Sequence, residues 1–380
     1  MTYSFLQHYW CFIVALLAAL LVFLMFVQGA NTLIFSLGRT TDERRLLVNC
    51  TGRKWEFTFT TLVTFGGAFF ASYPLFYSTS FGGAYWLWMI ILFSFVLQAV
   101  SYEFQNKMGN LLGAKTFQWM LVLNGFIGPL LLGGAVATFF TGSNFIVEKE
   151  TIMESGIISR WANASHGLDA LLNPWNVVLG LAIVFLVRVL GCLYIHKQVD
   201  DTAFDNHDRI IQPLWSGTIC FLFFFLIFLY HILTCEGYAV DPATGVVFME
   251  PYKYLHNLLA QWPLLVLLLI GIAAVLWGIG RSLLVKAWKR GFWVAGFGTV
   301  VTVTVLLLLT AWNNTSYYPS SADLQSSLTM QNSCSSEFTL RTMFWVSMLV
   351  PFVIAYIIYA WRAIDKKPLT VDEIKSDHAY

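Results

Sequence analysis

Long apolar runs separated by short polar segments follow one another along the whole chain. A helix needs about 20 apolar residues to cross the hydrocarbon core of a membrane. Nine runs meet this length, and we expect each to form a membrane-spanning helix: 10–37, 57–77, 82–102, 118–140, 176–196, 214–234, 258–280, 291–312 and 342–361. The first run is too long for the apolar part of a signal peptide, so we expect no cleavage there.

Lysine and arginine residues are divided unequally between the two sets of loops that nine crossings define. Cytoplasmic loops carry the excess of these residues in membrane proteins. The division therefore predicts that the N-terminus is outside and the C-terminus cytoplasmic. The richer set holds Arg39, Arg44, Arg45, Arg53, Lys54, Lys107, Lys115, Lys197, Arg209, Arg281, Lys286, Lys289, Arg290, Arg362, Lys366, Lys367 and Lys375, and the poorer set holds Lys149, Arg160, Lys253 and Arg341.

Composition excludes several classes of protein. Hydrophobic residues make up 58% of the chain and charged residues 11%, whereas soluble domains have about 45–50% and about 25%. A formal net charge of +1 leaves no basic excess for binding nucleic acid. We therefore predict an all-α, polytopic membrane protein with one integral membrane domain over 1–380. Nine helices would suit two four-helix bundles plus one peripheral helix.

The six cysteines are scattered and include no Cys-x-x-Cys pair. This spacing argues against a zinc or iron–sulfur site, so we expect no metal in the chain. Only Cys235 and Cys334 fall in the predicted outside loops, where a disulfide between them would be allowed. Paired glycines, Gly66-Gly67 and Gly133-Gly134, lie inside predicted spans and are expected to let helices approach closely.

Arg188 is the only full charge inside a predicted span. Ionisable residues in membrane helices are costly and usually functional. Two interpretations remain open for this arginine. It either extends toward lipid phosphates at the cytoplasmic surface, or it pairs with a partner chain or a bound anion.

Polar residues also gather near the predicted cytoplasmic ends of the first three spans. The first span contributes Gln28 and Asn31. Glu56 directly precedes the second span, and Glu103 directly follows the third, five residues after Gln98. These groups would either line one hydrated crevice that admits protons, or have separate roles unrelated to proton transfer. In the second case, the amides mark where the first span leaves the lipid.

In this second case, the two carboxylates are interfacial groups that balance the charge of nearby cations, namely Arg53, Lys54 and Lys107.

Histidines offer no haem site in this chain, because no two are placed to hold a haem between spans. His231, near the outer end of the sixth span, is more typical of a hydrogen-bonded interface residue than of a ligand.

Several segments together resemble one family, subunit II of bacterial cytochrome bd quinol oxidases. The resemblance extends over the whole chain, but its motifs lie in the first hundred and last seventy residues. The motifs are Gly38-Arg39-Thr40-Thr41-Asp42-Glu43-Arg44-Arg45, Trp55-Glu56, Gly66-Gly67-Ala68-Phe69-Phe70-Ala71-Ser72-Tyr73-Pro74, Tyr318-Pro319-Ser320-Ser321, Ser327-Leu328-Thr329-Met330 and Ser335-Ser336-Glu337-Phe338-Thr339-Leu340.

The resemblance implies a subunit of a terminal oxidase in the bacterial inner membrane. In that family, subunit I carries haems b and d and the quinol site, and subunit II packs beside it as a pseudo-symmetric partner without haem. The complex oxidises quinol, reduces dioxygen to water and builds a proton gradient. Trp55 and Arg188 would then be structural or partner contacts. A small single-span subunit, and a bound quinone or lipid, would be compatible with this assembly.

The chain departs from the family pattern at the groups associated with protons. Gln28 and Asn31 stand where better-known members have two aspartates. Gln98 stands in the position of an arginine, while Glu103 keeps the acid that follows it. Losing an arginine and an acid together is consistent with the removal of a buried ion pair, because an unpaired buried charge is expensive. The carboxylates left for proton transfer are Glu56 and Glu103.

Two other functions remain open from the sequence. A secondary transporter would suit nine helices, but transporters usually place ionisable or broken-helix sites near the midplane. A purely structural subunit, without a role in proton transfer, would have the same sequence features as an oxidase subunit.

Overall fold

The computed structural model describes residues 1–107, 109–148, 158–200, 206–366 and 368–369. The basic residues Lys149, Lys367 and Lys375 lie outside this range. The longer helices are α1 (Tyr3–Leu24), α5 (Trp55–Ser72), α7 (Tyr85–Phe104), α8 (Ala114–Thr141), α9 (Pro174–Gln198), α10 (Asn206–Thr234), α12 (Trp262–Leu284), α13 (Gly291–Ala311) and α16 (Val350–Ile364).

Shorter elements join or extend these helices. The short helices are α2 (Phe26–Asn31), α3 (Ile34–Leu37), α4 (Thr41–Gly52), α6 (Pro74–Phe76), α11 (Lys253–Ala260), α14 (Met330–Ser333) and α15 (Glu337–Ser347). A π-helical turn covers Tyr77–Gly83, and 3₁₀ turns cover Leu168–Leu172 and Leu324–Ser326. The strands are β1 (Phe145–Val147), β2 (Ser159–Trp161), β3 (Glu236–Val240) and β4 (Val247–Pro251).

Each of the nine predicted spans overlaps a helix or a bent pair of helices. Among the described residues, seven helical segments are long and apolar enough to cross a membrane, with α1 and α2 counted together. Two bent pairs raise the number to nine if each is one span. One joins Thr41–Ser72 to Pro74–Gly83 at 119°, and the other joins α15 to α16 at 42°.

Proline marks both of these bends. Pro74 follows Tyr73, which is the last residue before α6, and Pro351 lies in the first turn of α16. A proline disfavours helical backbone in the residue before it, because its ring clashes with that residue. Tyr73 accordingly has a non-helical φ of −133° and ψ of 67°. At the second bend, Pro351 has no N–H with which to continue the hydrogen bonds of α15.

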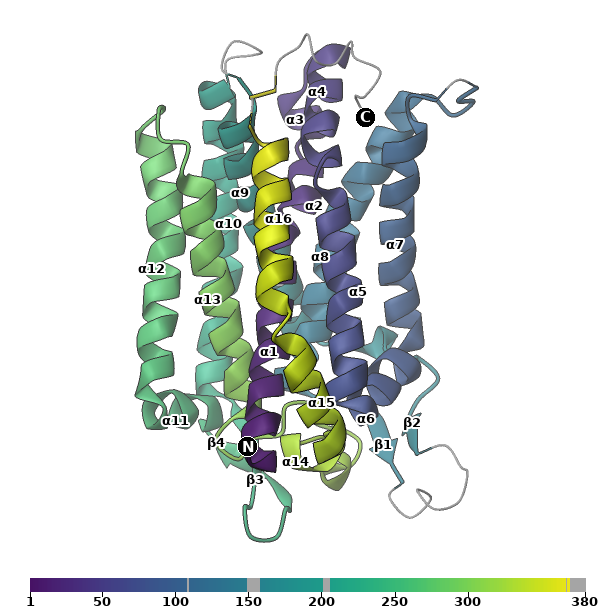
Figure 1. The fold of residues 1–380 in the computed structure, drawn as a ribbon, viewed down its shortest axis with the longest axis vertical. Helices are drawn as coiled ribbons and strands as arrows, with labels where there is room; N and C mark the ends of the chain where they lie inside the picture. The colour runs from purple at the N-terminus through teal and green to yellow at the C-terminus, as the bar shows by residue number, and fades with distance from the viewer. Residues whose placement is uncertain (108, 149–157, 201–205, 367, 370–380) are drawn as a thin grey trace.

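Helices α5, α7 and α8 lie toward one side of the bundle, and α9, α10, α12 and α13 lie toward the other (Figure 1). Helix α1 runs through the middle. Helix α16 is peripheral, since Trp361 is its only buried residue. The start of α1 and the end of α16 lie at opposite ends of the bundle, as an odd number of crossings requires.

Glycines let the central helices approach to backbone contact. A Cβ atom on Gly29 of α2 would lie 1.8 Å from the carbonyl oxygen of Val187, and one on Gly191 of α9 would lie 2.3 Å from the nitrogen of Ala30. The expectation of close approach is confirmed at Gly133, where a Cβ atom would lie 2.7 Å from the Cα atom of a glycine on α9. It is wrong for Gly67, which has no atom within 4 Å of that position.

Two features of the loops that we predicted to lie outside differ from the expectations. The all-α expectation omitted two small antiparallel sheets, β1–β2 and β3–β4, which form where long polar loops fold back on themselves. The allowed disulfide is not formed, because Cys235 and Cys334 are both free thiols. Cys235 directly follows α10, whereas Cys334 follows α14, which packs against α1.

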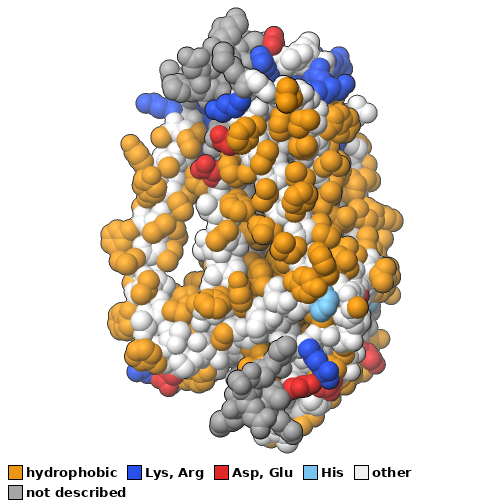
Figure 2. Space-filling model, turned by 90° about the vertical axis from the view of Figure 1, so that its right-hand side faces the viewer, with side chains coloured by type: hydrophobic (Ala, Val, Ile, Leu, Met, Phe, Trp, Pro, Cys, Tyr) orange, Lys and Arg blue, Asp and Glu red, His pale blue; other side chains and the backbone are white. Residues whose placement is uncertain are grey.

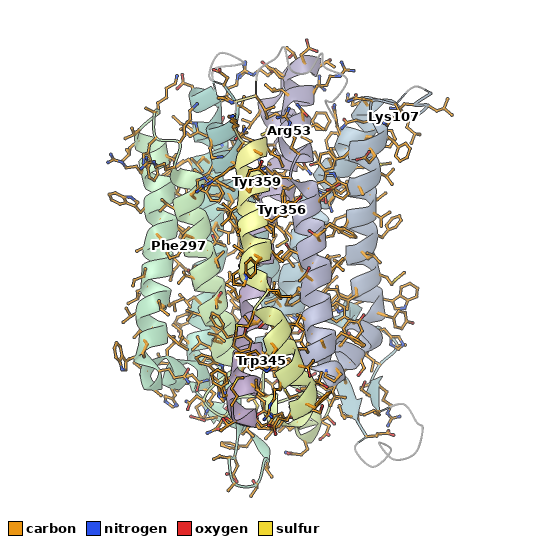
Figure 3. The ribbon with its side chains drawn as sticks, in the orientation of Figure 1. Arg53, Lys107, Phe297, Trp345, Tyr356 and Tyr359 are labelled. Carbon is orange, nitrogen blue, oxygen red and sulfur yellow. The ribbon has the colours of Figure 1, made fainter. Side chains whose placement is uncertain are left out.

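The surface has the distribution of a membrane protein. On the face in Figure 2, hydrophobic side chains cover the middle of the molecule, while Lys and Arg side chains lie near its two ends. Figure 3 shows Arg53 and Lys107 at one end and Trp345 toward the other. The end with Arg53 and Lys107 is the one that the charge division assigns to the cytoplasm.

Candidate functional site

The predicted polar residues of the first and third spans meet in the interior. The side-chain nitrogen Nε2 of Gln28, on α2, donates to Oε1 of Gln98, on α7, at 2.8 Å. Asn31, one turn further along α2, lies 2.8 Å through its Oδ1 from the hydroxyl of Tyr102. Gln28, Asn31 and Gln98 are fully buried. These three amides and Tyr102 form what we call the amide cluster.

Tyr102 connects the amide cluster to a second helix and to a predicted residue. Its hydroxyl also lies 2.8 Å from Oγ1 of Thr51, on α4. Its ring stacks on Trp55 with the centroids 6.1 Å apart and the planes 16° apart. The sequence did not single out Tyr102 or Thr51, although a tyrosine directly before Glu103 was a visible signal.

The amide cluster holds more polar atoms than it pairs. Within the described part of the chain, Oε1 of Gln28, Nδ2 of Asn31 and Nε2 of Gln98 are buried without a hydrogen-bond partner, as is Nε1 of Trp55. A buried polar group left unpaired costs about 1–3 kcal/mol. Buried water commonly satisfies such groups, making about three hydrogen bonds each. The cluster is therefore suited to holding water.

The carboxylates lie outside this cluster. Glu56 and Glu103 are exposed, and neither forms an ion pair or side-chain hydrogen bond with another described residue. No hydrogen bond or ion pair joins either carboxylate to the amide cluster within the described residues, so the single hydrated crevice stays a prediction. Each carboxylate directly follows one of the two stacked rings, Glu56 after Trp55 and Glu103 after Tyr102.

The expected charge balance between these carboxylates and the ammonium group of Lys54 is wrong. Lys54 is fully buried, and its Nζ lies 3.0 Å from Oδ1 of Asp365 in an ion pair that is not aligned as a hydrogen bond. Oδ2 of the same carboxylate accepts from Nζ of Lys197 at 2.7 Å and from Nε1 of Trp361 at 2.9 Å. The Lys54 ammonium also lies 4.2 Å from the ring centroid of Trp361. Lys54, Lys197 and Asp365 form a buried charge triad that joins α5, α9 and the end of α16.

Arg188 meets neither a carboxylate nor the amide cluster. Its Nη1 donates to Oγ1 of Thr32 at 2.6 Å and to the carbonyl oxygen of the same residue at 3.2 Å. It forms no ion pair with a described residue of this chain. Both interpretations of Arg188 therefore remain predictions.

Histidine and apolar features bear on cofactors. The ring of His231 stacks on Trp175 with centroids 3.7 Å apart, which places it in a contact between α9 and α10. Over the described ranges, no cluster of three or more His, Cys, Asp and Glu side chains could hold a metal ion.

A cavity of about 90 Å³ lies between α1, α8, α9, α10, α12 and α13, with apolar side chains such as Leu21, Leu186 and Phe225 among its walls.

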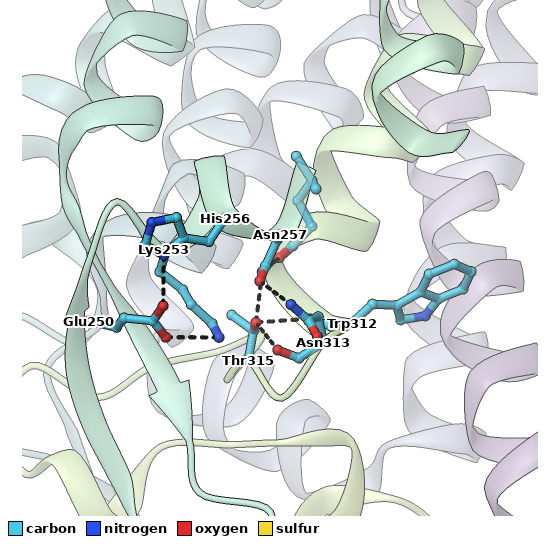
Figure 4. Close-up of polar contacts among 8 residues, drawn as sticks. Glu250, Lys253, His256, Asn257, Trp312, Asn313 and Thr315 are labelled. Atoms are coloured by element: carbon cyan, nitrogen blue, oxygen red, sulfur yellow. Dashed lines mark hydrogen bonds and ion pairs between the residues drawn. The ribbon is translucent and has the colours of Figure 1, made fainter. Parts of the chain in front are cut away.

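A further polar cluster supports the opposite end of the bundle (Figure 4). Asn257 is fully buried, and its Nδ2 donates to the carbonyl oxygen of Leu309 at 3.0 Å and to Oγ1 of Thr315 at 2.8 Å. Nδ2 of Asn313 donates to Oδ1 of Asn257 at 2.9 Å. The cluster fixes the end of α13 to α11, so it is structural.

Comparison with known proteins gives the class of protein and then the family. A multi-pass arrangement of apolar helices is shared with respiratory oxidase subunits of the bacterial inner membrane, and residues 6–364 match the family model described as cytochrome bd terminal oxidase subunit II. The chain belongs to that family of subunits of quinol oxidase complexes.

Two relatives agree with this assignment, and a solved structure has the same fold. The chain is 24% identical over 364 residues to the cytochrome bd-I ubiquinol oxidase subunit 2 of Escherichia coli K12, covering 93% of each protein. It is 24% identical over 380 residues to the cytochrome bd ubiquinol oxidase subunit 2 of Bacillus subtilis 168, covering 96% of this chain and 99% of that protein. The bd oxidase structure from Geobacillus thermodenitrificans has a chain with the same fold, with a TM-score of 0.63 at 10% identity, over 96% of this chain and 99% of that one.

Proposed function

We propose that the chain is the haem-free subunit of a heterodimeric oxidase that transfers electrons from quinol to dioxygen. Haems b and d, which supply the redox chemistry, belong to the partner subunit in this proposal. The chain supports that partner and contributes to the route by which cytoplasmic protons reach the oxygen-reducing site. The family match over residues 6–364 is the observation that carries the proposal.

The exposed face of α5 supports the proposal that the chain contacts a partner subunit there. Glu56, Thr60, Thr64 and Gly67 follow one another at helical spacing, and all four are exposed. A charged or hydroxyl-bearing face is unfavourable against lipid chains, whereas small and hydroxyl residues are common where membrane helices pack. The face of α5 is therefore better suited to another protein than to lipid.

The proton route that we propose begins at the exposed carboxylates. Glu56 and Glu103 collect protons from the cytoplasmic side, and the hydroxyl of Tyr102 passes them toward the buried amides. Amide side chains orient water through both donor and acceptor atoms. Gln28, Asn31 and Gln98 would thus guide protons through water in the part of the path where the family pattern has charged groups.

The apolar cavity is suited to binding a ligand that takes no part in catalysis. Its walls are apolar side chains of α1, α8, α9, α10, α12 and α13. Such a space accepts a hydrocarbon chain better than a polar group. We propose that the tail of a quinone or lipid enters it and acts structurally.

Purification through a tag on this chain tests the oxidase assignment. The complex should show the absorption bands of haems b and d, while the chain expressed alone should carry no stoichiometric haem. Haem-free, monomeric material that moves a solute would contradict the oxidase assignment and favour a transporter. Tightly bound haem in the isolated chain would contradict the haem-free role.

The proton role is tested by the double variant Glu56→Gln/Glu103→Gln. Oxygen consumption, normalised to haem d, should fall, while haem content and quinol binding should stay near the parent values. Glu236→Gln, an exposed carboxylate on β3 at the other end of the bundle, is the matched control. Unchanged turnover of the double variant across the working pH range would remove this chain from the proton path and favour a purely structural subunit.

A further inference from the structure

A polar pocket of about 580 Å³ opens at the end of the bundle where α9 ends and α10 begins. The charge division assigns this end to the cytoplasm. The pocket lies between the segment after α2 and the first turns of α10. Its lining residues are Ser36, Arg39, Arg188, Asp208, Arg209, Gln212, Pro213 and Ser216.

Arg188 lines this pocket, and only part of its guanidinium forms hydrogen bonds with described residues. It lies ten residues before the end of α9, which is about 15 Å at 1.5 Å per residue. Both of its hydrogen bonds, to Thr32, come from Nη1. Nε and Nη2 have no acceptor among the described residues, although an arginine carries five N–H donors and always keeps its charge. The geometry therefore leaves an arginine fork available to a ligand.

The charges around the pocket favour an anion. Arg209 is neutralised by Glu43, whose Oε1 lies 2.8 Å from its Nη1. Arg39 is exposed, and neither it nor Arg188 forms an ion pair within the described ranges. Asp208 is the one carboxylate in the described lining, and it forms no described ion pair. Two unpaired guanidiniums against one carboxylate leave the pocket positive.

The side chains beside the guanidiniums supply further donors. The amide of Gln212 and the hydroxyls of Ser36 and Ser216 line the same space. An arginine fork and neutral N–H and O–H donors together are the usual set for the oxygens of a phosphate group.

The surface next to the pocket is apolar. Along α10, the exposed residues change from Gln212 and Ser216 to an apolar stripe at helical spacing that runs away from the pocket. The stripe consists of Trp215, Ile219, Phe223, Leu226 and Tyr230. Tryptophan is enriched at the membrane–water interface, so Trp215 places the pocket mouth at the depth of lipid headgroups.

We propose that this pocket binds the phosphate group of an anionic phospholipid, whose acyl chains lie along the exposed stripe of α10. Arg188 and Arg39 hold the phosphate, and the neutral donors fix its orientation. A free phosphate ion has the same headgroup chemistry, but it would leave the apolar stripe unused. Basic pockets between membrane helices on the cytoplasmic side bind anionic headgroups in this way.

Thermal unfolding of the intact oxidase complex, stripped of lipid in detergent, tests the proposal. The probes are phosphatidylglycerol, phosphatidylcholine and inorganic phosphate. Phosphatidylglycerol should raise the melting temperature of the parent in a saturable way, and the other two should not. In Arg188→Gln the half-saturating concentration should rise about tenfold, as expected for the loss of a charge-assisted hydrogen bond.

Arg281→Gln is the matched control, because it removes an exposed arginine at the same end of the bundle outside the pocket. It should saturate like the parent. If Arg188→Gln fails to assemble, Arg39→Gln provides the test at an exposed position, with a rise of about threefold, or roughly half of that free energy. The lipid assignment is overturned if inorganic phosphate gives the full shift, if phosphatidylcholine matches phosphatidylglycerol, or if the pocket variants saturate like Arg281→Gln.

Discussion

At the scale of single residues, the buried charge triad is the clearest departure from what a protein interior favours. The exposed fraction of the side chain is 0% for Lys54 and 8% for Asp365. One carboxylate serves two ammonium groups, with Trp361 completing the contacts through its N–H and its ring face. A buried ion pair adds little net stability, but removing one partner leaves an uncompensated charge. Replacing the single carboxylate should therefore destabilise the protein more than replacing one of the two ammonium groups.

We expect Asp365→Asn to be far more harmful than Lys54→Met. The first change leaves two ammonium groups without a carboxylate, at a cost of about 3–5 kcal/mol. The second leaves the pair between Lys197 and Asp365 intact. Melting temperatures of the two variants in the intact complex check this order. Equal losses would mean that the triad does not act as a charge unit.

We expect Glu250 to make the segment that joins β4 to α11 sensitive to acid. The hydrogen bond with His256, 2.9 Å from Nδ1 to Oε1, and then the ion pair with Lys253 at 3.1 Å, hold the pKa of Glu250 below its usual value of 4.5. These contacts are visible in Figure 4. A lowered pKa in the folded state means that Glu250 stabilises the fold above the unfolded pKa. This contribution is lost as the pH falls through the lower, folded value.

Melting temperature between pH 6 and pH 3.5, for the parent and Glu250→Gln, measures this effect. The variant should lose the part of the acid dependence that lies below about pH 4.5, the usual pKa of this carboxyl group. Its penalty near neutral pH should be within about 1 kcal/mol, since the carboxylate is partly exposed. Parallel curves for the two proteins would show that Glu250 is not an acid-sensitive contact.

At the scale of elements, the contact between α2 and α9 decides where the amide cluster lies. α2 is fully buried, and its backbone touches that of α9 at two glycines, Gly29 and Gly191. In membranes, helices associate through close packing of small residues rather than by burying apolar surface from water. The close contact of α2 with α9 fixes the helix whose Gln28 and Asn31 face α7 and Tyr102.

Gly191→Val should prevent this contact. The new Cβ atom would meet the backbone of α2, which cannot yield as a side chain can. We expect poor assembly and loss of haem d from the purified complex. Gly280→Val, on α12, is the matched control, since its new side chain meets no atom within 4 Å in this chain. Normal assembly of Gly191→Val would show that α2 and α9 separate without consequence.

At the scale of the whole molecule, opposite ends of the bundle carry different structures. The end with α4 and the last turn of α16 is basic, whereas the end with the start of α1 carries both small sheets and α14 (Figure 1). A protein inserted with its basic loops in the cytoplasm would expose the sheets outside.

Reporter fusions test this orientation. Fusions after residue 45 and after residue 370 should both report cytoplasm, and a fusion near residue 325 should report the outside. The expectation follows from the distribution of Lys and Arg between the two sets of loops. Two reversed reporters would contradict the nine-span arrangement.

The sequence by itself determined the class of protein, the approximate spans and the family. These properties depend on run length, charge division and short motifs, all of which are local along the chain. It also selected Gln28, Asn31 and Gln98, because a polar side chain in an apolar run needs an explanation.

Only the tertiary structure decided which of these residues act together. Asp365 lies more than three hundred residues from Lys54, and no local pattern predicts that the last helix returns to the second. Likewise, Glu56 and Glu103 follow the stacked residues Trp55 and Tyr102 directly but point outward. Contacts between distant segments depend on how helices pack and rotate, and backbone approach at glycines such as Gly191 sets that packing here.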